Sequence, residues 1–202
     1  MLFALEPLRQ NWFRHNWHMD AVSAHRELRT MTSTLHNDTK PARYVFVLMP
    51  DFTLLSFASA VEALRIANRM AGATVYDWQL VGEGGSTMTC SAGTRFELDT
   101  DLPELQRDDT ILLCGGLDIQ NATSRRLLNW LRRESRRGVA IGGLCTAALT
   151  MARAGLLDGK RATIHWENHD SFAEEFMEVE LTKSVFTIDG NRYTTAGGTA
   201  SI

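Results

Sequence analysis

The stretch that most restricts the fold is VAIGGLCTAALTMARAGLL, residues 139–157, in which a short apolar strand runs directly into an alanine-rich helix. Cys145 stands at the junction, with Gly143 two residues before it and Ala147 two residues after it. A turn this tight forces its central residue into a strained backbone conformation, and only small neighbours avoid collision. The pattern predicts a nucleophile elbow, a turn that belongs to a sheet whose strands are followed by helices.

The chain around this junction alternates between short apolar strands and amphipathic helices. We expect strands at residues 44–49, 76–82, 110–114 and 139–142, a small hairpin within 87–99, and a short strand in RATIHW that ends at His165. We expect helices from Ser56, which would cap the first one, to Gly72, at 121–137 and at 146–154, and two final strands joined by a type I′ turn at 189–191. This alternation predicts a three-layer α/β sandwich with a mostly parallel central sheet.

The carboxyl ends of parallel strands are where ligands bind in such sheets. A thiol at Cys145 would lie at a helix N-terminus, whose amides favour a thiolate and can donate to an oxyanion. After residue 42 the chain contains two histidines; we interpret His165 as the candidate base and His169 as a surface residue. Gly115 and Gly116 follow the third strand and are predicted to let backbone amides approach a ligand.

Composition narrows the class of protein further. With 202 residues and 44% hydrophobic residues, the chain suits one well-buried domain. A net charge of -3 offers no positive field for DNA phosphates. Cys90, Cys114 and Cys145 fit neither a zinc spacing nor a disulfide framework, so we expect free thiols, no metal and no cofactor. The sequence lacks a membrane-spanning run or a signal peptide, which predicts a cytoplasmic protein.

Several segments together resemble one family. They are YVFVLMPDFTLLSFASAVEALRIAN, the glycine pair at 115–116, GLCTAALTMARAGLLDGKRATIHWEN and YTTAGGTASI. From about Arg43 onward the chain is similar to the amidotransferase-like N-terminal domain of AraC-family (GlxA-type) transcription regulators, within the PfpI and class I glutamine amidotransferase superfamily. The segment 142–168 is the most diagnostic. The resemblance implies a flavodoxin-like fold and a domain that dimerises and senses a small nitrogen metabolite, such as an amino acid, betaine or carnitine.

The resemblance also bears on catalysis. Enzyme members of the superfamily use a cysteine and a histidine at the positions of Cys145 and His165. Enzymes of the PfpI and deglycase type place a glutamate near Ser56, and a serine cannot serve as that acid. We therefore expect ligand binding without catalysis. The alternatives are a cysteine-dependent hydrolase, amidase or deglycase that uses Cys145 and His165, and a scaffold that only dimerises.

The candidate ligand-binding residues surround the predicted elbow. They are Phe52, Gly115, Gly116, Leu144, Cys145, Thr146, His165 and Trp166. Phe52 and Trp166 are interpreted either as a cation–π box for a small cation or as plain packing. His165 is interpreted either as a ligand contact or as a core histidine satisfied by backbone.

The two ends of the chain differ from its middle. Residues 1–42 contain four of the six histidines and are expected to form a loosely ordered extension, whereas residues 43–202 form the sensing domain. The chain stops at GGTASI, where the regulators continue into helix-turn-helix motifs, so we expect DNA contact only through a C-terminal domain that this chain lacks. An arginine cluster at 132–137 is interpreted as a solvated helix face.

Overall fold

The computed structural model describes residues 40–197. Along the chain the strands and helices are β1 (Ala42–Leu48), α3 (Leu54–Ala71), β2 (Tyr76–Val81), β3 (Thr87–Thr89), β4 (Arg95–Glu97), β5 (Thr110–Cys114), α4 (Arg125–Arg136), β6 (Ala140–Leu144), α5 (Ala148–Arg153), β7 (Arg161–Ala162), α6 (His169–Glu175), β8 (Glu180–Leu181), β9 (Phe186–Asp189) and β10 (Arg192–Thr195). Short 3-10 turns occupy Cys145–Ala147 and Trp166–Asn168. The expectations for residues 1–39 and 198–202 lie outside the described residues.

The central sheet contains six strands in the order β2-β1-β5-β6-β10-β9. Every neighbouring pair is parallel except β10 and β9, which are antiparallel. The five parallel strands, taken in chain order, follow the 2-1-3-4-5 arrangement of flavodoxin-like folds, in which ligands bind beyond the carboxyl ends of the strands. The predicted fold class is confirmed.

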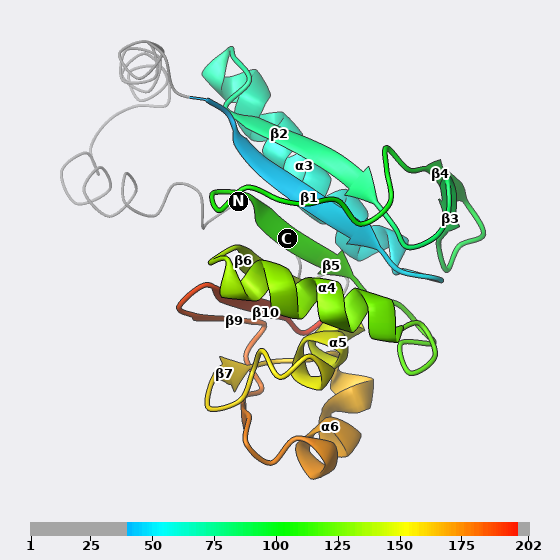
Figure 1. Ribbon diagram of the computed structural model, residues 1–202, viewed down its shortest axis with the longest axis vertical. Coiled ribbons are helices and arrows are strands. Elements are labelled where there is room, and N and C mark those ends of the chain that lie inside the picture. Colours follow the sequence, from blue (N-terminus) through cyan, green and yellow to red (C-terminus); the bar gives the residue numbers. More distant parts are fainter. Residues whose placement is uncertain (1–39, 198–202) are drawn as a thin grey trace, which may run out of the picture.

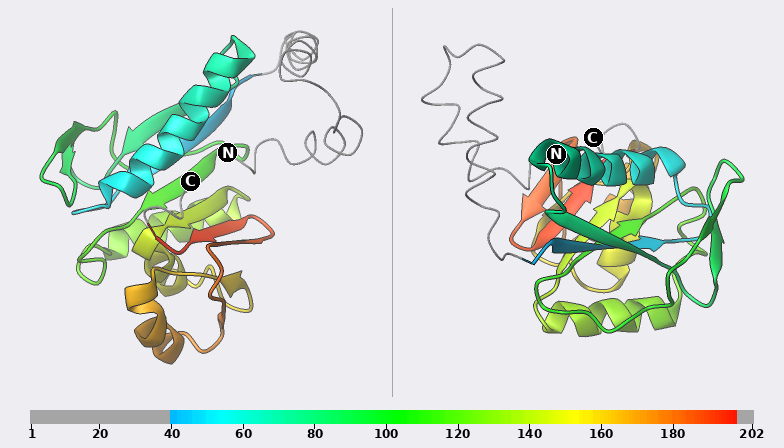
Figure 2. Two further views of the ribbon diagram at one scale, coloured as in Figure 1. Left: turned by 180° about the vertical axis from the view of Figure 1, so that it is seen from behind. Right: turned by 90° about the horizontal axis from the view of Figure 1, so that it is seen from above.

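Helices cover both faces of this sheet (Figures 1 and 2). The right view of Figure 2 shows α3 on one face and α4 on the other. α3 buries Phe57 and Leu64, while α4 and α5 share a second buried cluster that includes Leu131 and Leu149. The apolar strands are therefore shielded from water on both sides, which explains why their sequences read as continuous hydrophobic runs. No helix in the described part of the chain is long and apolar enough to cross a membrane.

The helix boundaries differ slightly from those predicted. α3 begins at Leu54, so Ser56 lies inside its first turn and is fully buried rather than acting as the cap. It ends as predicted at Gly72, whose φ is +69°. α4 begins only at Arg125, because the Ser124 side chain accepts a hydrogen bond from the Leu127 N–H at 3.0 Å and so caps the helix there.

Two predictions about the last third of the chain were wrong. His165 does not end a strand of the central sheet, because β7 stops at Ala162 and pairs only with β8. The next N–H, that of Thr163, donates to the side-chain hydroxyl of Thr194 in β10 and not to a backbone carbonyl. The β9–β10 hairpin exists, but its turn is not type I′. Gly190 has a positive φ and Asn191 does not, which is the pattern of type II′.

The arginine-rich face of α4 is exposed at Arg133, Arg136 and Arg137, as predicted, but it covers a buried carboxylate. Glu134, within the cluster, is fully buried. Its carboxylate accepts a hydrogen bond from Arg133 at 2.8 Å and lies 3.5 Å from the Arg137 guanidinium. The outer arginines therefore neutralise a buried carboxylate, and part of this charge run serves the structure of the helix.

Candidate functional site

The turn between β6 and α5 has the geometry of a nucleophile elbow. Cys145 has a φ of +61° and is one of two non-glycine residues in the described chain with a positive φ. A Cβ at Gly143 would lie 2.9 Å from both the Ala148 nitrogen and the Met151 sulfur, so a larger residue does not fit. The predicted strain at Cys145 and the need for a small residue at 143 are both confirmed.

The Cys145 side chain is enclosed, with 4% of the residue's surface exposed. Its sulfur lies 3.6 Å from the Thr53 hydroxyl, at the start of α3. The Cys145 N–H donates to the Thr195 hydroxyl, which lies at the end of β10, at 3.2 Å. The elbow therefore brings together the carboxyl ends of β1, β6 and β10, which are far apart in the sequence.

His165 reaches this site through its backbone, because its N–H donates to the Cys145 carbonyl at 3.3 Å. The imidazole Nδ1 is buried without a hydrogen bond and lies 3.6 Å from a Glu167 carboxylate oxygen. On its other side the ring faces Gly197, where a Cβ would lie 3.2 Å from Cδ2. His165 thus borders the elbow, although it comes from a loop and not from a strand.

The glycine pair after β5 has a structural explanation. A Cβ at Gly115 would lie 2.5 Å from the Ala147 nitrogen, and one at Gly116 would lie 1.8 Å from the Asp51 carbonyl oxygen. Thr53 donates its N–H to the Gly115 carbonyl at 2.9 Å. Both glycines allow three loops to pack tightly, which differs from the predicted reason, and contact with a ligand stays a prediction.

The remaining candidate residues lie in two places. Leu144 and Thr146 flank Cys145 and are buried with it, and the Thr146 hydroxyl donates to the Gly116 carbonyl at 2.8 Å. Phe52 is fully buried and packs edge to face against Phe57 and Phe96, with ring centroids 5.7 and 5.5 Å away.

Trp166, in contrast, is 73% exposed, and its ring lies 5.7 Å from that of His165. The Phe52 ring packs inside the core and the Trp166 ring lies at the surface. The structure therefore does not bring these two rings together as a cation–π box.

All three thiols of the chain are buried. Burial raises the pKa of the Cys114 thiol far above its ordinary range, with a further contribution from the neighbouring Cys145. A thiol with so high a pKa is poorly suited to act as a nucleophile. Within residues 40–197 no cluster of three or more histidine, cysteine, aspartate or glutamate side chains is arranged to hold a metal ion.

Sequence reasoning missed Thr53 and Thr195, whose hydroxyls contact the elbow. The only available signal was position, because Thr195 ends a strand and Thr53 follows one, and both strands end at the same edge of the sheet as β6. It also missed Ser56 as a buried group: the Ser56 hydroxyl has no hydrogen-bond partner in the described chain.

Comparison with known proteins agrees with this geometry. Residues 42–202 match the DJ-1/PfpI family. The HTH-type transcriptional regulator CdhR of Pseudomonas aeruginosa is 42% identical over 157 residues, which are 78% of this chain and 46% of that protein. The HTH-type transcriptional regulator GlxA of Rhizobium meliloti is 36% identical over 161 residues, 79% of this chain and 50% of that protein.

The crystal structure of an AraC family transcriptional regulator from Pseudomonas putida superposes with a TM-score of 0.70 at 27% identity, covering 80% of this chain and 86% of that one. The chain spans about half the length of the curated relatives it matches. It belongs to the DJ-1/PfpI family and is homologous to the DJ-1/PfpI domain of AraC-type transcription regulators.

Proposed function

We propose that this chain is the ligand-sensing and dimerisation domain of a cytoplasmic AraC-type regulator, and that it binds a small nitrogen metabolite without chemical turnover. The ligand is an amino acid, a betaine or a carnitine-like compound held beside Cys145. In the whole protein, DNA contact belongs to a domain outside these 202 residues. The observation that carries the proposal is that the thiol at the elbow has a neutral hydroxyl, and no carboxylic acid, as its polar side-chain partner in the described chain.

The thiol has no acid as a partner, and two of the amides near it are engaged in other hydrogen bonds. Ser56 stands where the related enzymes have a glutamate, and the partner within 3.6 Å of the thiol is the neutral hydroxyl of Thr53. The Cys145 N–H already donates to Thr195, and the Gly115 N–H donates to the Leu144 carbonyl at 3.4 Å. Two amides near the elbow are thus engaged and do not point at an empty oxyanion position.

Thermal unfolding in the presence of candidate ligands tests the sensing proposal. A ligand at about 100 times its dissociation constant that binds only the folded chain adds about 2.7 kcal/mol to the free energy of unfolding. We expect at least one member of a panel of amino acids, betaines and carnitine to raise the melting temperature. A panel that leaves it unchanged would contradict the proposal.

A cysteine hydrolase, amidase or deglycase is the second candidate, because the positive φ of Cys145 is a strained conformation typical of nucleophiles at such turns. Activity assays with amides, esters and glyoxals compare the wild type with Cys145→Ala and Cys145→Ser. We expect no multiple turnover from any of the three. Turnover by the wild type that both substitutions abolish would favour the hydrolase over the sensor.

A further inference from the structure

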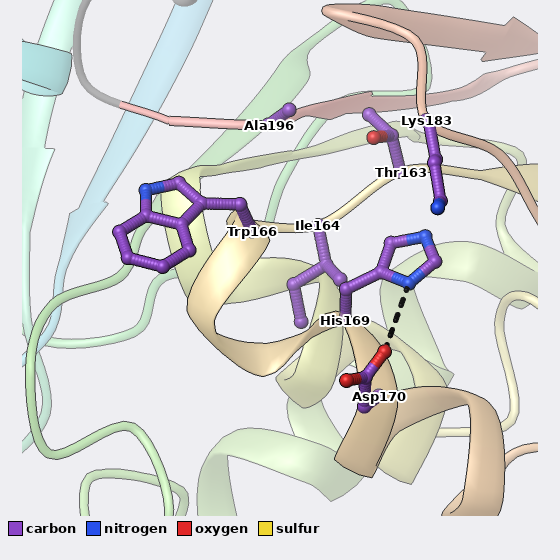
Figure 3. A pocket seen from close by; sticks show the side chains of 7 residues that line it. All are labelled: Thr163, Ile164, Trp166, His169, Asp170, Lys183 and Ala196. Atoms are coloured by element: carbon purple, nitrogen blue, oxygen red, sulfur yellow. Dashed lines mark ion pairs between the residues drawn. The ribbon is translucent and has the colours of Figure 1, made fainter.

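A cavity of about 300 Å³ lies beside the His165 segment, and we call it the side pocket. Its lining comes from both sides of His165 in the sequence and from the loops that flank β9 and β10. The lining residues are Thr163, Ile164, Trp166, His169, Asp170, Lys183 and Ala196 (Figure 3). This volume is at the lower end of the range for pockets that hold small molecules.

One wall of the side pocket carries two nitrogen groups that lack protein partners. The Lys183 ammonium and the His169 imidazole point toward one another (Figure 3). The His169 Nε2 is buried without a hydrogen bond, and Lys183 has neither an ion pair nor a hydrogen bond within residues 40–197. A buried polar nitrogen left without a partner is costly, so this wall favours a ligand that supplies an acceptor.

Asp170 flanks the other nitrogen of the His169 ring. The His169 Nδ1 lies 3.8 Å from an Asp170 carboxylate oxygen, on the side of the ring away from Lys183 (Figure 3). The unpartnered Nε2 is therefore the ring nitrogen on the side of Lys183. An N–H at Nε2 and the Lys183 ammonium together suit the two oxygens of a carboxylate, because hydrogen bonds from an ammonium to a carboxylate are strong.

Trp166 lines the side pocket at the end away from Lys183. It is 73% exposed, and Figure 3 shows its ring pointing away from Lys183 and His169, with Ile164 between them. The groups of the pocket that can recognise a polar ligand are therefore the nitrogens of Lys183 and His169.

We infer that the side pocket binds the carboxylate of a small metabolite, and that Lys183 and His169 hold it. This inference rests on the proposed function: it assigns the carboxylate of the proposed nitrogen metabolite to the side pocket, beside the His165 segment that borders the elbow. It gives His169 a role in binding, whereas its place in the sequence indicated only a surface residue.

Isothermal titration calorimetry on the whole chain tests this inference. The probes are glycine betaine, L-carnitine and L-arginine, together with choline and agmatine, which lack the carboxylate. The variant Lys183→Met removes the ammonium, and Arg136→Met is the matched control, because Arg136 is exposed on α4 and its loss changes the net charge equally. Lys183 is exposed, so its replacement leaves the core intact.

We expect the wild type to bind at least one zwitterion, and Lys183→Met to bind it at least tenfold more weakly while Arg136→Met binds it as the wild type does. Equal affinities of Lys183→Met and the wild type would overturn the side-pocket inference and leave the sensing proposal standing. The inference would also be overturned if the wild type bound glycine betaine no more tightly than choline, or L-arginine no more tightly than agmatine. Failure of the wild type to bind any probe would overturn the sensing proposal, and the inference with it.

Discussion

At the scale of single residues, the backbone of Cys145 has a direct energetic consequence. Its positive φ costs about 1 to 3 kcal/mol for a residue with a Cβ, and glycine avoids that cost. We expect Cys145→Gly to have a free energy of unfolding about 1 kcal/mol higher than Cys145→Ala, because both lack the thiol and differ only at Cβ. Urea unfolding of the two variants measures the difference.

The matched control is Ala152→Gly in α5, where the backbone is helical. There the exchange of alanine for glycine should lower the free energy of unfolding by about 1 kcal/mol. If glycine destabilises position 145 as much as it destabilises position 152, then the elbow is not strained.

Gly116 gives a second prediction at this scale. A Cβ would lie 1.8 Å from the Asp51 carbonyl oxygen, so Gly116→Ala must push apart the two loops that meet there. We expect a loss of about 3 kcal/mol in the free energy of unfolding. Gly85→Ala is the control, because Gly85 is exposed and its nearest neighbour would lie 3.3 Å from the added carbon. Similar losses in the two variants, measured by urea unfolding, would contradict this explanation.

The residue types that the elbow needs could be predicted from the sequence, but the residues that contact the elbow could not. Gly143 and Cys145 are two positions apart, so the geometry of one turn determines both. The close approach of Gly116 to Asp51 depends on contacts between residues 65 positions apart, which no local pattern encodes. Likewise, nothing in the sequence places Thr195 next to Cys145.

At the scale of elements, an ion pair fastens the start of β1 to the turn before β5. The Arg43 Nε donates to an Asp109 carboxylate oxygen at 2.9 Å, and Asp109 is 2% exposed. Burial raises the pKa of Asp109, but hydrogen bonds from Arg43 and from the Gln106 N–H outweigh it, so the pKa lies below its ordinary value. This carboxylate therefore stabilises the fold in its charged form.

We expect Asp109→Asn to lower the free energy of unfolding at pH 7 by about 1.5 to 3 kcal/mol. Because the folded pKa is depressed, the contribution of Asp109 is complete above the ordinary aspartate pKa of about 3.9 and is lost as the pH falls through the lower folded value. The difference between the wild type and the variant should thus shrink below about pH 4.

The adjacent Asp108 provides the control for this pair. It is exposed and lies 3.7 Å from the Lys40 ammonium, so Asp108→Asn should change the free energy of unfolding by less than about 0.5 kcal/mol. Urea unfolding at several pH values compares the three proteins. A pH-independent gap between wild type and Asp109→Asn would show that the carboxylate charge does not stabilise the β1–β5 junction.

Hydrophobic patterns in the sequence predicted most of the helices and strands. The errors occur where contacts between distant residues determine the local structure. The strands of the central sheet are short apolar runs buried on both faces, and such runs are readable in sequence. β7 ends earlier than predicted because the Thr163 N–H, which would pair with a carbonyl in a longer strand, donates to the Thr194 hydroxyl. The turn type depends on the φ of Asn191, and asparagine adopts both positive and negative φ, so the sequence did not determine it.

At the scale of the whole molecule, the strand order is the feature that the sequence left open. Alternating strands and helices predict a parallel sheet, yet they are compatible with several orders. The 2-1-3-4-5 arrangement determines which loops meet, and it places the ends of β1, β5, β6 and β10 around one thiol. The side pocket depends on the same arrangement, because it joins loops that are separated along the chain by up to 33 residues.

The last prediction concerns DNA. The net charge of the chain is -3, and several arginines in and next to α4 are bonded to other groups of the protein. Arg132 donates to the carbonyls of Arg153 and Ala154 at 2.9 and 3.1 Å, and Arg137 donates to Glu104 at 2.6 Å. Guanidinium groups held in this way do not form a free basic surface for phosphates, and affinity for duplex DNA rests mainly on such a surface.

We therefore expect this chain alone to select no motif from a pool of random duplexes at about 50 mM salt, a concentration at which phosphate contacts are strong. A helix-turn-helix protein carried through the same rounds of selection shows that the pool and the conditions work. Any retardation of duplexes by this chain should be weak and equal for all sequences, because contacts with phosphates carry no sequence information. Enrichment of one sequence by the 202-residue chain would show that it reads DNA by itself, and the division between a sensing domain and a separate DNA-binding domain would then be wrong.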